Sequence, residues 1–482
     1  MTAQAVDGVR TWPMLVAGEW VTTRETFSVR SPWDGRLVAE VSSGGAAQAQ
    51  AAVAAAQAAM AAGLPLDERA AILERAAVSV EARADEVARL LALEVGKPVS
   101  AGRVEAARCA MTLRYSAVAA RTLAGDAIPL EGHPGGRGHL GFTLRVPVGI
   151  VGAITPFNFP FNLAAHKIGP ALAGGCAVVL KPADKAPLAA LLLGEILIDA
   201  GLPGGWLSIV CAGRPEPVVD VLVEDPRVRV LTFTGSSAIG WSLRERAPRK
   251  RVLLELGNST PLIVCADADL EAAADAAART GFGFAGQSCI SVQRVLVHES
   301  VAERFSELLA AAARRTVLGD PLDPATALGP MINAGARERV IATIEAAVAA
   351  GARRLAGGVG EHGHLEPTVL TNVPRDSEVY RREIFGPVVS VTSVDSLEEA
   401  IHLANETEYG LQAGIYTLDV TSALRAAARL DFGGVTINES PSYRLDQMPY
   451  GGIKESGNTR EGPLYAVREM TEERLVILNG AG

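Results

Sequence analysis

The sequence has few cysteines, no long uncharged apolar run and no excess of positive charge. Its five cysteines are scattered along 482 residues without a Cys-x-x-Cys pair, so they predict neither a disulfide framework nor a zinc site, and we expect no metal. The best apolar candidate, Leu188–Leu202, is short and contains Glu195 and Asp199, so we expect no membrane-spanning helix. The first residues lack a charged stretch followed by an apolar one, which argues against a secretory signal and favours the cytoplasm.

The formal net charge of −9 argues against a nucleic-acid-binding surface, which would need a basic patch. Hydrophobic residues make up 49% and charged residues 21%, as in globular rather than disordered chains. The length exceeds what one ordinary core accommodates, so we expect two or three domains.

Most of the first 125 residues show helical spacing after a short strand-like entry. A Gly/Pro/His cluster at 131–138 between two extended segments then predicts a hairpin. From Val148 to Leu254, and again from Leu262 to Asn438, short β-rich runs alternate with helices, and Arg468–Leu478 is predicted to be a strand. Such alternation indicates parallel sheets built from βαβ units, hence an α/β fold with a ligand cleft between two halves.

Cys289 lies in the segment GFGFAGQSCISVQR, on a glycine-flanked loop just before a predicted strand. Backbone N–H groups on such a loop can face a substrate, and a thiolate there is an effective nucleophile. The alternative is a buried small side chain, which is what we expect of the other four cysteines. The polar neighbours Gln287 and Ser288 favour the nucleophile for Cys289.

Two further segments place polar side chains directly after predicted strands. Glu255 in LLELGNSTP stands at a strand end, where α/β sheets carry their working residues, although a lone glutamate is often only solvated or paired. Asn158 in ITPFNFPFN is held between two prolines, so its amide could donate to a developing oxyanion, although it could equally be a turn asparagine.

Taken together, these motifs resemble the aldehyde dehydrogenase superfamily over almost the whole chain. EIFGPV (Glu383–Val388) and PYGGIKESG (Pro449–Gly457) follow in the family's order, and SYRLDQMPYGGIKESG and ISVQR are most similar to its lactaldehyde- and glyceraldehyde-type branch. The resemblance implies a Rossmann-type cofactor domain, an α/β catalytic domain and a small β oligomerisation module. The boundaries we expect are 1–120 with 143–253, 254–438, and 121–142 with 465–482. In the family the hairpin adds strands to a neighbouring subunit's sheet, so a homodimer or homotetramer is expected.

The resemblance also implies a mechanism. Cys289 would attack the aldehyde to give a thiohemiacetal, Asn158 would stabilise its oxyanion, and Glu255 would activate the water that hydrolyses the later thioester. Family members that pass the acyl group to coenzyme A usually lack this glutamate, so hydrolysis to the acid is favoured and a coenzyme A-acylating semialdehyde dehydrogenase is the alternative. A non-catalytic relative would not need all three residues.

For the cofactor, the resemblance implies NAD, with NADP possible. FTGSSAIG opens a helix after a strand, so Gly235 and Ser236 would place a helix N-terminus near the pyrophosphate. Lys181 and Asp184 match residues that contact the adenosine ribose, and the carboxylate would repel a 2′-phosphate. The remaining cofactor-binding candidates are Thr155, Pro156, Phe157, Leu256, Glu383 and Phe385.

The substrate-binding candidates are Arg108, Phe159, Ser288 and Arg444. Arg108 and Arg444 resemble basic residues that bind anionic substrates. At Ser288 and Phe159, members that use phosphonate or phosphorylated aldehydes often carry a basic residue and a Tyr or His. We therefore expect a small, hydroxylated aldehyde, with a phosphonate or phosphorylated aldehyde as the alternative.

Two positions depart from the family pattern. Asn258 replaces the second glycine of ELGG, next to Glu255, and Thr459 replaces the second glycine of SGxG. The Thr459 exchange puts in doubt a loop conformation that would require a positive φ.

The loop around Cys289 generates the first prediction. Cys289→Ala should abolish dehydrogenase activity while NAD binding and folding persist, because only this thiol is placed to attack a carbonyl. Replacing Cys109, Cys176, Cys211 or Cys265 should cost stability at most. Turnover by Cys289→Ala above about a thousandth of wild type, a barrier increase below roughly 4 kcal/mol, would contradict the assignment.

Overall fold

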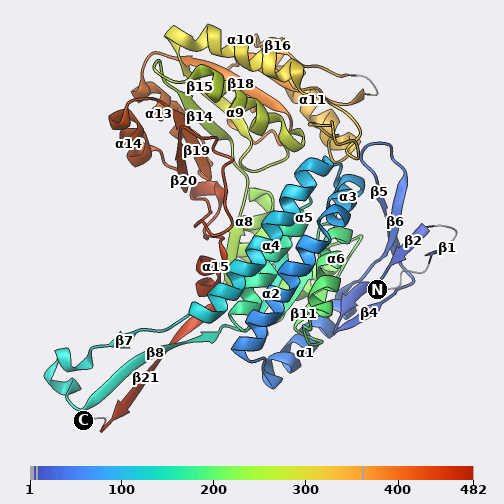
Figure 1. Cartoon of the computed structure of the whole chain (residues 1–482), viewed down its shortest axis with the longest axis vertical. Coiled ribbons are helices and arrows are strands. Elements are labelled where there is room, and N and C mark those ends of the chain that lie inside the picture. Colours follow the sequence, from blue (N-terminus) through green and yellow to red (C-terminus); the bar gives the residue numbers. More distant parts are fainter. Residues whose placement is uncertain (1–4, 7–8, 361–362, 481–482) are drawn as a thin grey trace.

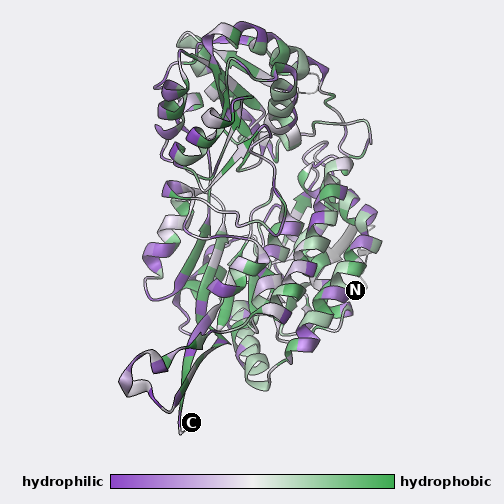
Figure 2. Ribbon diagram, turned by 60° about the vertical axis from the view of Figure 1, so that its left-hand side comes forward, coloured by the Kyte–Doolittle hydropathy of each residue, from purple (hydrophilic) through white to green (hydrophobic). Residues whose placement is uncertain are grey.

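The computed structural model describes residues 5–6, 9–360 and 363–480. Two large, mainly parallel sheets flanked by helices lie one above the other, and a thin three-stranded sheet projects from the lower part (Figure 1). The strands of both large sheets are predominantly hydrophobic, as expected of strands covered on both faces (Figure 2). The predicted α/β class is therefore confirmed.

The first large sheet has the strand order β13-β12-β9-β10-β11-β3-β4. Its strands are β3 (Met14–Val16), β4 (Glu19–Val21), β9 (Ile150–Ile154), β10 (Val178–Lys181), β11 (Leu207–Ile209), β12 (Val228–Thr234) and β13 (Arg251–Glu255). From β9 the chain moves outward to β10 and β11, then returns to β12 on the other side of β9. This reversal makes a topological switch point between β9 and β12, and ligands of such sheets bind outside the carboxyl ends of the strands there.

Most helices in the part of the molecule around the first large sheet come directly before or after one of its strands in the sequence. They are α1 (Ala46–Ala62), α2 (Leu66–Ala82), α3 (Ala84–Val95), α4 (Val99–Thr122), α5 (Pro160–Ala173), α6 (Pro187–Asp199), α7 (Glu216–Glu224), α8 (Ser237–Arg246) and α15 (Pro463–Glu469). Helix α5 is buried along its whole length, which holds the segment before it rigidly. The N-terminal entry contains more strand than predicted, because β1 (Ala5–Val6), β2 (Val9–Trp12), β5 (Thr26–Arg30) and β6 (Leu37–Ser42) form a separate four-stranded sheet.

The second large sheet has the order β16-β17-β18-β15-β14-β19-β20. Its strands are β14 (Thr260–Val264), β15 (Val292–His298), β16 (Arg353–Ala356), β17 (Thr368–Thr371), β18 (Val388–Val394), β19 (Gln412–Tyr416) and β20 (Gly434–Ile437). Its helices are α9 (Leu270–Phe282), α10 (Glu299–Arg315), α11 (Ala334–Ala349), α12 (Glu378–Arg381), α13 (Leu397–Asn405) and α14 (Val420–Arg429). All strands except β16 run parallel.

The projecting sheet consists of β7 (Ala127–Ile128), β8 (His139–Pro147) and β21 (Thr471–Asn479), with β8 in the centre. The predicted hairpin is present, with two 3₁₀ turns, η1 (Leu130–Gly132) and η2 (Pro134–Gly136), between its strands. The C-terminal strand begins at Thr471 rather than Arg468, because the residues before it complete α15. The division into three domains stays a prediction.

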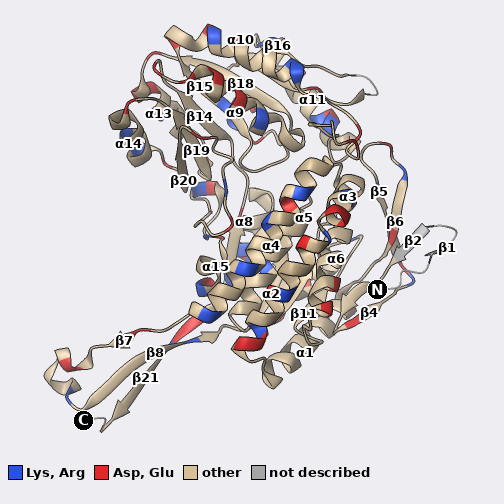
Figure 3. Ribbon diagram, in the orientation of Figure 1, with Lys and Arg blue, Asp and Glu red and all other residues tan. Residues whose placement is uncertain are grey.

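Charged residues of both signs are interspersed over the outer helices (Figure 3). Within the described ranges, no helix combines the length and apolar character needed to cross a bilayer.

Candidate functional site

Every candidate site residue from the sequence lines one cavity of about 740 Å³ between the two large sheets. The first sheet contributes residues at the carboxyl ends of its parallel strands, including Lys181 and Glu255. The second sheet contributes loops that precede its strands, with Cys289 before β15 and Glu383 before β18. The cavity is therefore formed where the carboxyl edge of one sheet meets the amino edge of the other.

The loop that carries Cys289 begins with a left-handed turn. In the 3₁₀ segment η3 (Gly283–Gly286), Phe284, Ala285 and Gly286 all have positive φ, at 50°, 54° and 65°. Such a conformation costs non-glycine residues roughly 1–2 kcal/mol each and persists only where surrounding contacts hold it. Here the following Gln287 supplies those contacts, since its fully buried side chain donates to the Phe284 carbonyl and accepts from the Ile332 N–H.

The Asn158 side chain points to the same loop. It is 4% exposed, and its amide nitrogen donates to the Gln287 carbonyl at 3.0 Å. Since an amide NH₂ group has two donors, one remains for a substrate oxyanion. The main chain of Asn158 is fixed by a hydrogen bond, because the buried ammonium of Lys97 donates to its carbonyl oxygen at 2.7 Å. Lys97 in turn forms a buried ion pair with Glu105.

The Cys289 sulfur lies 3.0 Å from the Tyr450 hydroxyl. Loss of hydration in the cavity raises the pKa of the Cys289 thiol to about 12, although the Tyr450 hydrogen bond and the Arg444 charge act in the opposite direction. Among the other cysteines, Cys109, Cys176 and Cys211 are buried as expected, whereas Cys265 is partly exposed.

Glu255 is 4% exposed, and neither of its carboxyl oxygens has a hydrogen-bond partner. Burial and the nearby carboxylate of Glu461 raise the pKa of Glu255 well above its usual value. The segment after β20 approaches this carboxyl closely because position 451 is glycine, where a Cβ atom would stand 2.9 Å from the Glu255 oxygen and 2.0 Å from the Thr459 carbonyl oxygen. Glu255 is thus an enclosed carboxyl whose charged form is disfavoured in this cavity.

The pKa of the neighbouring carboxyl, Glu461, is shifted in the opposite direction. Its carboxylate lies 2.8 Å from an Arg444 nitrogen and 3.4 Å from the Lys167 ammonium, and all three side chains are buried. Burial opposes ionisation, but the charges of Lys167 and Arg444 outweigh it and lower the pKa of Glu461 to about 2. Two cations therefore favour the charged form of Glu461, whereas burial and the lack of a hydrogen-bond partner among the described residues disfavour the charged form of Glu255.

The cofactor candidates line the part of the cavity at the switch point. Helix α8 follows β12, and its N-cap residue Ser236 makes no side-chain capping bond, so the first N–H groups of the helix are open to an anion. The hydroxyls of Thr155 and Thr234 are buried there without a partner. Lys181 is buried at the end of β10, and Asp184 is exposed at the rim.

On the opposite wall, Glu383 accepts a hydrogen bond from the Asn258 N–H at 3.2 Å. Burial raises the pKa of Glu383 to about 7. Phe385 has a positive φ of 50° and meets Phe157 edge-on, with ring centroids 5.9 Å apart. Pro156, Gly235 and Leu256 complete this wall.

The two predicted anion-binding arginines differ in how available their guanidinium groups are to a ligand. Arg108 forms a bidentate pair with Asp446, at 2.8 and 3.2 Å, and is partly exposed to the cavity. The Arg444 guanidinium is buried between Glu461 and the ring of Tyr450, and its Nε has no hydrogen-bond partner. Of the other candidates, Ser288 is partly exposed in the cavity, and Phe159 lies under the Lys97 ammonium, 3.7 Å from the ring centroid.

The cavity residues that were not assigned from the sequence include Arg279, Tyr450 and Glu461. Arg279 lies at the cavity in the last turn of α9. In the sequence it is a single arginine within a helical pattern, and no motif around it marks it as a binding residue. Tyr450 stands inside PYGGIKESG, which served only to identify the family, and Glu461 follows that motif by a few residues. Only the folded chain brings Tyr450 and Glu461 next to Cys289 and Glu255.

Neither departure from the family pattern disturbs the backbone, because neither Asn258 nor Thr459 has a positive φ. The Asn258 side chain makes hydrogen bonds that a glycine could not make. Its amide donates to the Thr260 hydroxyl and the Gln412 carbonyl and accepts from the Leu411 N–H. It therefore ties the connection after β13 to the neighbouring β19.

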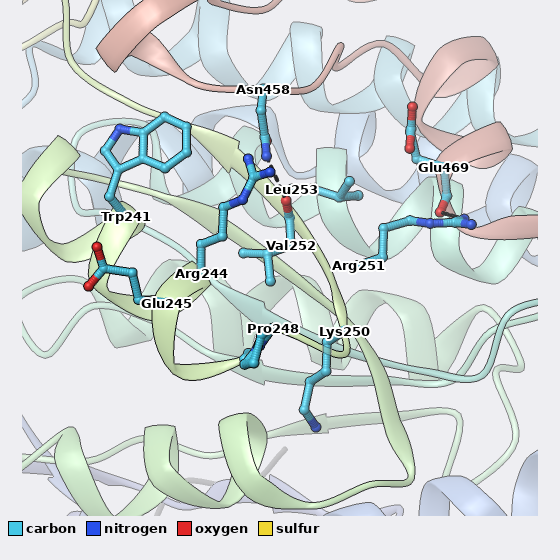
Figure 4. Close-up of a pocket in the computed structure, with 11 residues that line it drawn as sticks. Trp241, Arg244, Glu245, Pro248, Lys250, Arg251, Val252, Leu253, Asn458 and Glu469 are labelled. Atoms are coloured by element: carbon cyan, nitrogen blue, oxygen red, sulfur yellow. Dashed lines mark hydrogen bonds between the residues drawn. The ribbon is translucent and has the colours of Figure 1, made fainter.

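A second cavity, of about 630 Å³, lies beside β13 (Figure 4). Its cations are engaged with the protein itself, since Lys250 donates to the Val228 carbonyl and Arg251 donates to the carbonyls of Glu469 and Thr471. Among the described residues that line it, the Trp241 indole nitrogen is buried without a hydrogen-bond partner, but this cavity holds none of the candidate catalytic residues.

Comparison with known proteins gives consistent matches. A family model described as the aldehyde dehydrogenase family matches residues 20–476. A 3-sulfolactaldehyde dehydrogenase from Priestia aryabhattai is 43% identical over 471 residues, which cover 98% of each chain. A lactaldehyde dehydrogenase from Methanococcus maripaludis is 39% identical over 412 residues, covering 85% of this chain and 87% of the relative. The structure of glyceraldehyde-3-phosphate dehydrogenase GapN from Methanocaldococcus jannaschii with NADP superimposes with a TM-score of 0.91 at 38% identity, covering 95% of this chain and 100% of the other.

Proposed function

Because the chain belongs to the aldehyde dehydrogenase family, we propose that Cys289, Asn158 and Glu255 perform its NAD(P)-dependent oxidation of an aldehyde to the carboxylic acid. The observation that carries the proposal is that a thiol, an amide with an uncommitted N–H and an unpartnered carboxyl line one enclosed cavity. These are a nucleophile, an oxyanion donor and a general base within one pocket.

In the proposed reaction, Cys289 loses its proton and its sulfur bonds to the aldehyde carbon. The uncommitted N–H of Asn158 and the Cys289 N–H stabilise the resulting oxyanion. A bound nicotinamide cofactor would supply the hydride acceptor, so that the adduct on Cys289 would become a thioester. Glu255, once deprotonated, takes a proton from the water that attacks the thioester, so the acid leaves and the thiol is restored. Because the pKa of Glu255 is raised, its deprotonated form becomes more abundant as the pH rises, so hydrolysis should accelerate with pH.

The residues present fit a dinucleotide. An uncapped α8 N-terminus suits a pyrophosphate, and the unpartnered hydroxyls of Thr155 and Thr234 offer polar contacts beside it. Lys181 and Asp184 would meet the adenosine ribose, and Glu383 would meet the nicotinamide ribose. The carboxylate of Asp184 favours NAD over NADP, whereas Lys181 opposes that preference.

For the substrate, we propose a short 2-hydroxyaldehyde with an anionic group at its far end. The names of two relatives, 3-sulfolactaldehyde dehydrogenase and lactaldehyde dehydrogenase, support the short hydroxylated chain. Arg279 supports the anionic end, because it lies at the cavity and is only loosely paired, with Glu439 at 3.6 Å. Arg108 adds a second cation, partly neutralised by Asp446.

Two alternative functions differ from this proposal, the first in its product and the second in its substrate. A coenzyme A-acylating enzyme would release an acyl thioester, and Glu255 in the cavity argues against it because water needs a base there. A phosphonate or phosphorylated aldehyde would carry up to one more negative charge than a sulfonate, while Arg108 is already paired with Asp446 and Ser288 adds no cation.

We also propose that the projecting sheet assembles the chain into a homodimer or homotetramer. Its outer strand β21 leaves Leu475, Ile477 and Leu478 about half exposed, which is unusual for a strand of a soluble monomer. The edge strand β20 of the second large sheet is open as well, with Ile437 exposed. Strand addition between copies would cover both edges.

Glu255→Gln should separate the two half-reactions. The amide fills the same space but cannot accept a proton, so a rapid NADH burst should survive while steady turnover falls by about a hundredfold or more. Loss of burst and turnover together would place Glu255 in thiol activation, and no change in either would contradict the proposal. The same exchange at Glu245, in the second cavity, is the matched control.

Arg279→Met should raise KM for an anionic aldehyde such as sulfolactaldehyde about five- to tenfold, because the cation is partly screened at the cavity mouth. Lactaldehyde should be oxidised as before, and added salt should shrink the difference. Arg304→Met on α10 is the matched control, since Arg304 is exposed outside the cavity. An equal effect on both aldehydes would contradict an anion-binding role.

Asp184→Ser tests cofactor choice. We expect wild type to favour NAD by roughly 10- to 100-fold in kcat/KM, about 1.4 to 2.8 kcal/mol, because a carboxylate repels the 2′-phosphate. The variant should narrow or reverse that ratio mainly through KM for NADP, whereas Asp199→Ser at the end of α6 should not. A wild-type preference for NADP would mean that Lys181 dominates.

A further inference from the structure

Tyr450 is held firmly beside the Cys289 sulfur. Its ring is 4% exposed and packs in one apolar cluster with Ile290 and Leu411, with Cys289 at the edge of the cluster. Its backbone is fixed as well, by a β-bridge to Glu461. Since both ring and main chain are held, the 3.0 Å contact between the hydroxyl and the sulfur is built into the fold.

A cation lies on the face of the same ring. The Arg444 guanidinium carbon stands 3.8 Å from the Tyr450 ring centroid, and the salt bridge to Glu461 keeps it there. A cation in this position withdraws electron density from the ring, so the phenol O–H becomes a stronger donor. Glu461, Arg444, Tyr450 and Cys289 thus form a continuous chain of contacts.

The charges around Cys289 explain why a donor is needed. Four groups face its sulfur: Glu255 from β13, Glu383 from the loop before β18, and Arg444 and Tyr450 from the segment after β20. The two carboxyl groups and the loss of hydration disfavour a thiolate, while Arg444 and the Tyr450 hydrogen bond favour it.

We propose that Tyr450 is a further catalytic residue, whose hydroxyl donates to the Cys289 thiolate while Arg444 strengthens the donor. The catalytic part rests on the proposed aldehyde oxidation, whereas the hydrogen bond concerns the thiol itself. The thiol proton leaves to water, Tyr450 keeps its own proton, and its O–H turns toward the charged sulfur. Once the sulfur bonds to the aldehyde carbon its negative charge is gone, so the interaction supports the free nucleophile rather than the adduct.

Tyr450→Phe tests this directly, because it keeps the ring, its packing and the Arg444 contact and removes only the hydroxyl. The rate of alkylation by iodoacetamide, followed on the peptide that contains Cys289, gives the thiol pKa across a pH series. We expect that pKa to rise by about one unit, so that roughly tenfold less thiolate is present at a given pH. Tyr443→Phe, a neighbouring and exposed tyrosine, is the matched control and should leave the profile unchanged.

Turnover provides the second readout. In Tyr450→Phe, kcat/KM for the aldehyde should fall about tenfold at neutral pH and reach the neutral-pH value of wild type about one pH unit higher, with KM for NAD unchanged, whereas a merely structural loss would not be matched by slower alkylation of Cys289. An unchanged or lowered thiol pKa would overturn the proposal, the latter because Tyr450 would then be accepting from the thiol. A raised thiol pKa in a protein that oxidises no aldehyde would support the hydrogen bond and overturn the proposed function instead.

Discussion

The four-residue connection between β13 and β14 constrains the whole site. Because β13 ends at Glu255 and β14 starts at Thr260, the carboxyl edge of the first sheet must face the amino edge of the second. Loops from both edges then line the same space, and Cys289 and Glu255 meet although they belong to different sheets. Asn258 secures this connection by bonding to the backbone of β19 and the residue before it.

A second feature that shapes the site is that its buried carboxyl groups differ in how strongly their charged forms are favoured. Lys167 and Arg444 stand beside Glu461 and favour its charged form, while burial and the nearby Glu461 raise the pKa of Glu255. A buried ion pair is weak evidence for stability, because desolvation offsets most of the attraction. In this protein the ion pair between Glu461 and Arg444 positions a side chain, since it holds the Arg444 guanidinium against the Tyr450 ring.

Much of the fold follows from local pattern. The helical spacing of the first 125 residues predicted the helical region that holds α1–α4, without the break between α2 and α3. The βαβ alternation predicted both parallel sheets, and the motifs predicted the family that the comparisons confirm. Strand β19, with the sequence QAGIY, was not predicted because a central glycine interrupts its apolar run, and the strands of the N-terminal entry are too short to show a period. The rule that working residues follow strands found Glu255, but it does not apply to Cys289, which precedes one.

The sequence by itself determined the α/β class, the family and the identity of every candidate that lines the cavity, because short motifs of fixed spacing carry that information. Only the tertiary structure decided which groups face those candidates. Tyr450 and Arg444 are far from Cys289 along the chain, and no motif surrounds Arg279. The raised pKa of Glu255 depends on enclosure and on Glu461. Hydration and distance set such properties, and both exist only once distant segments have packed together.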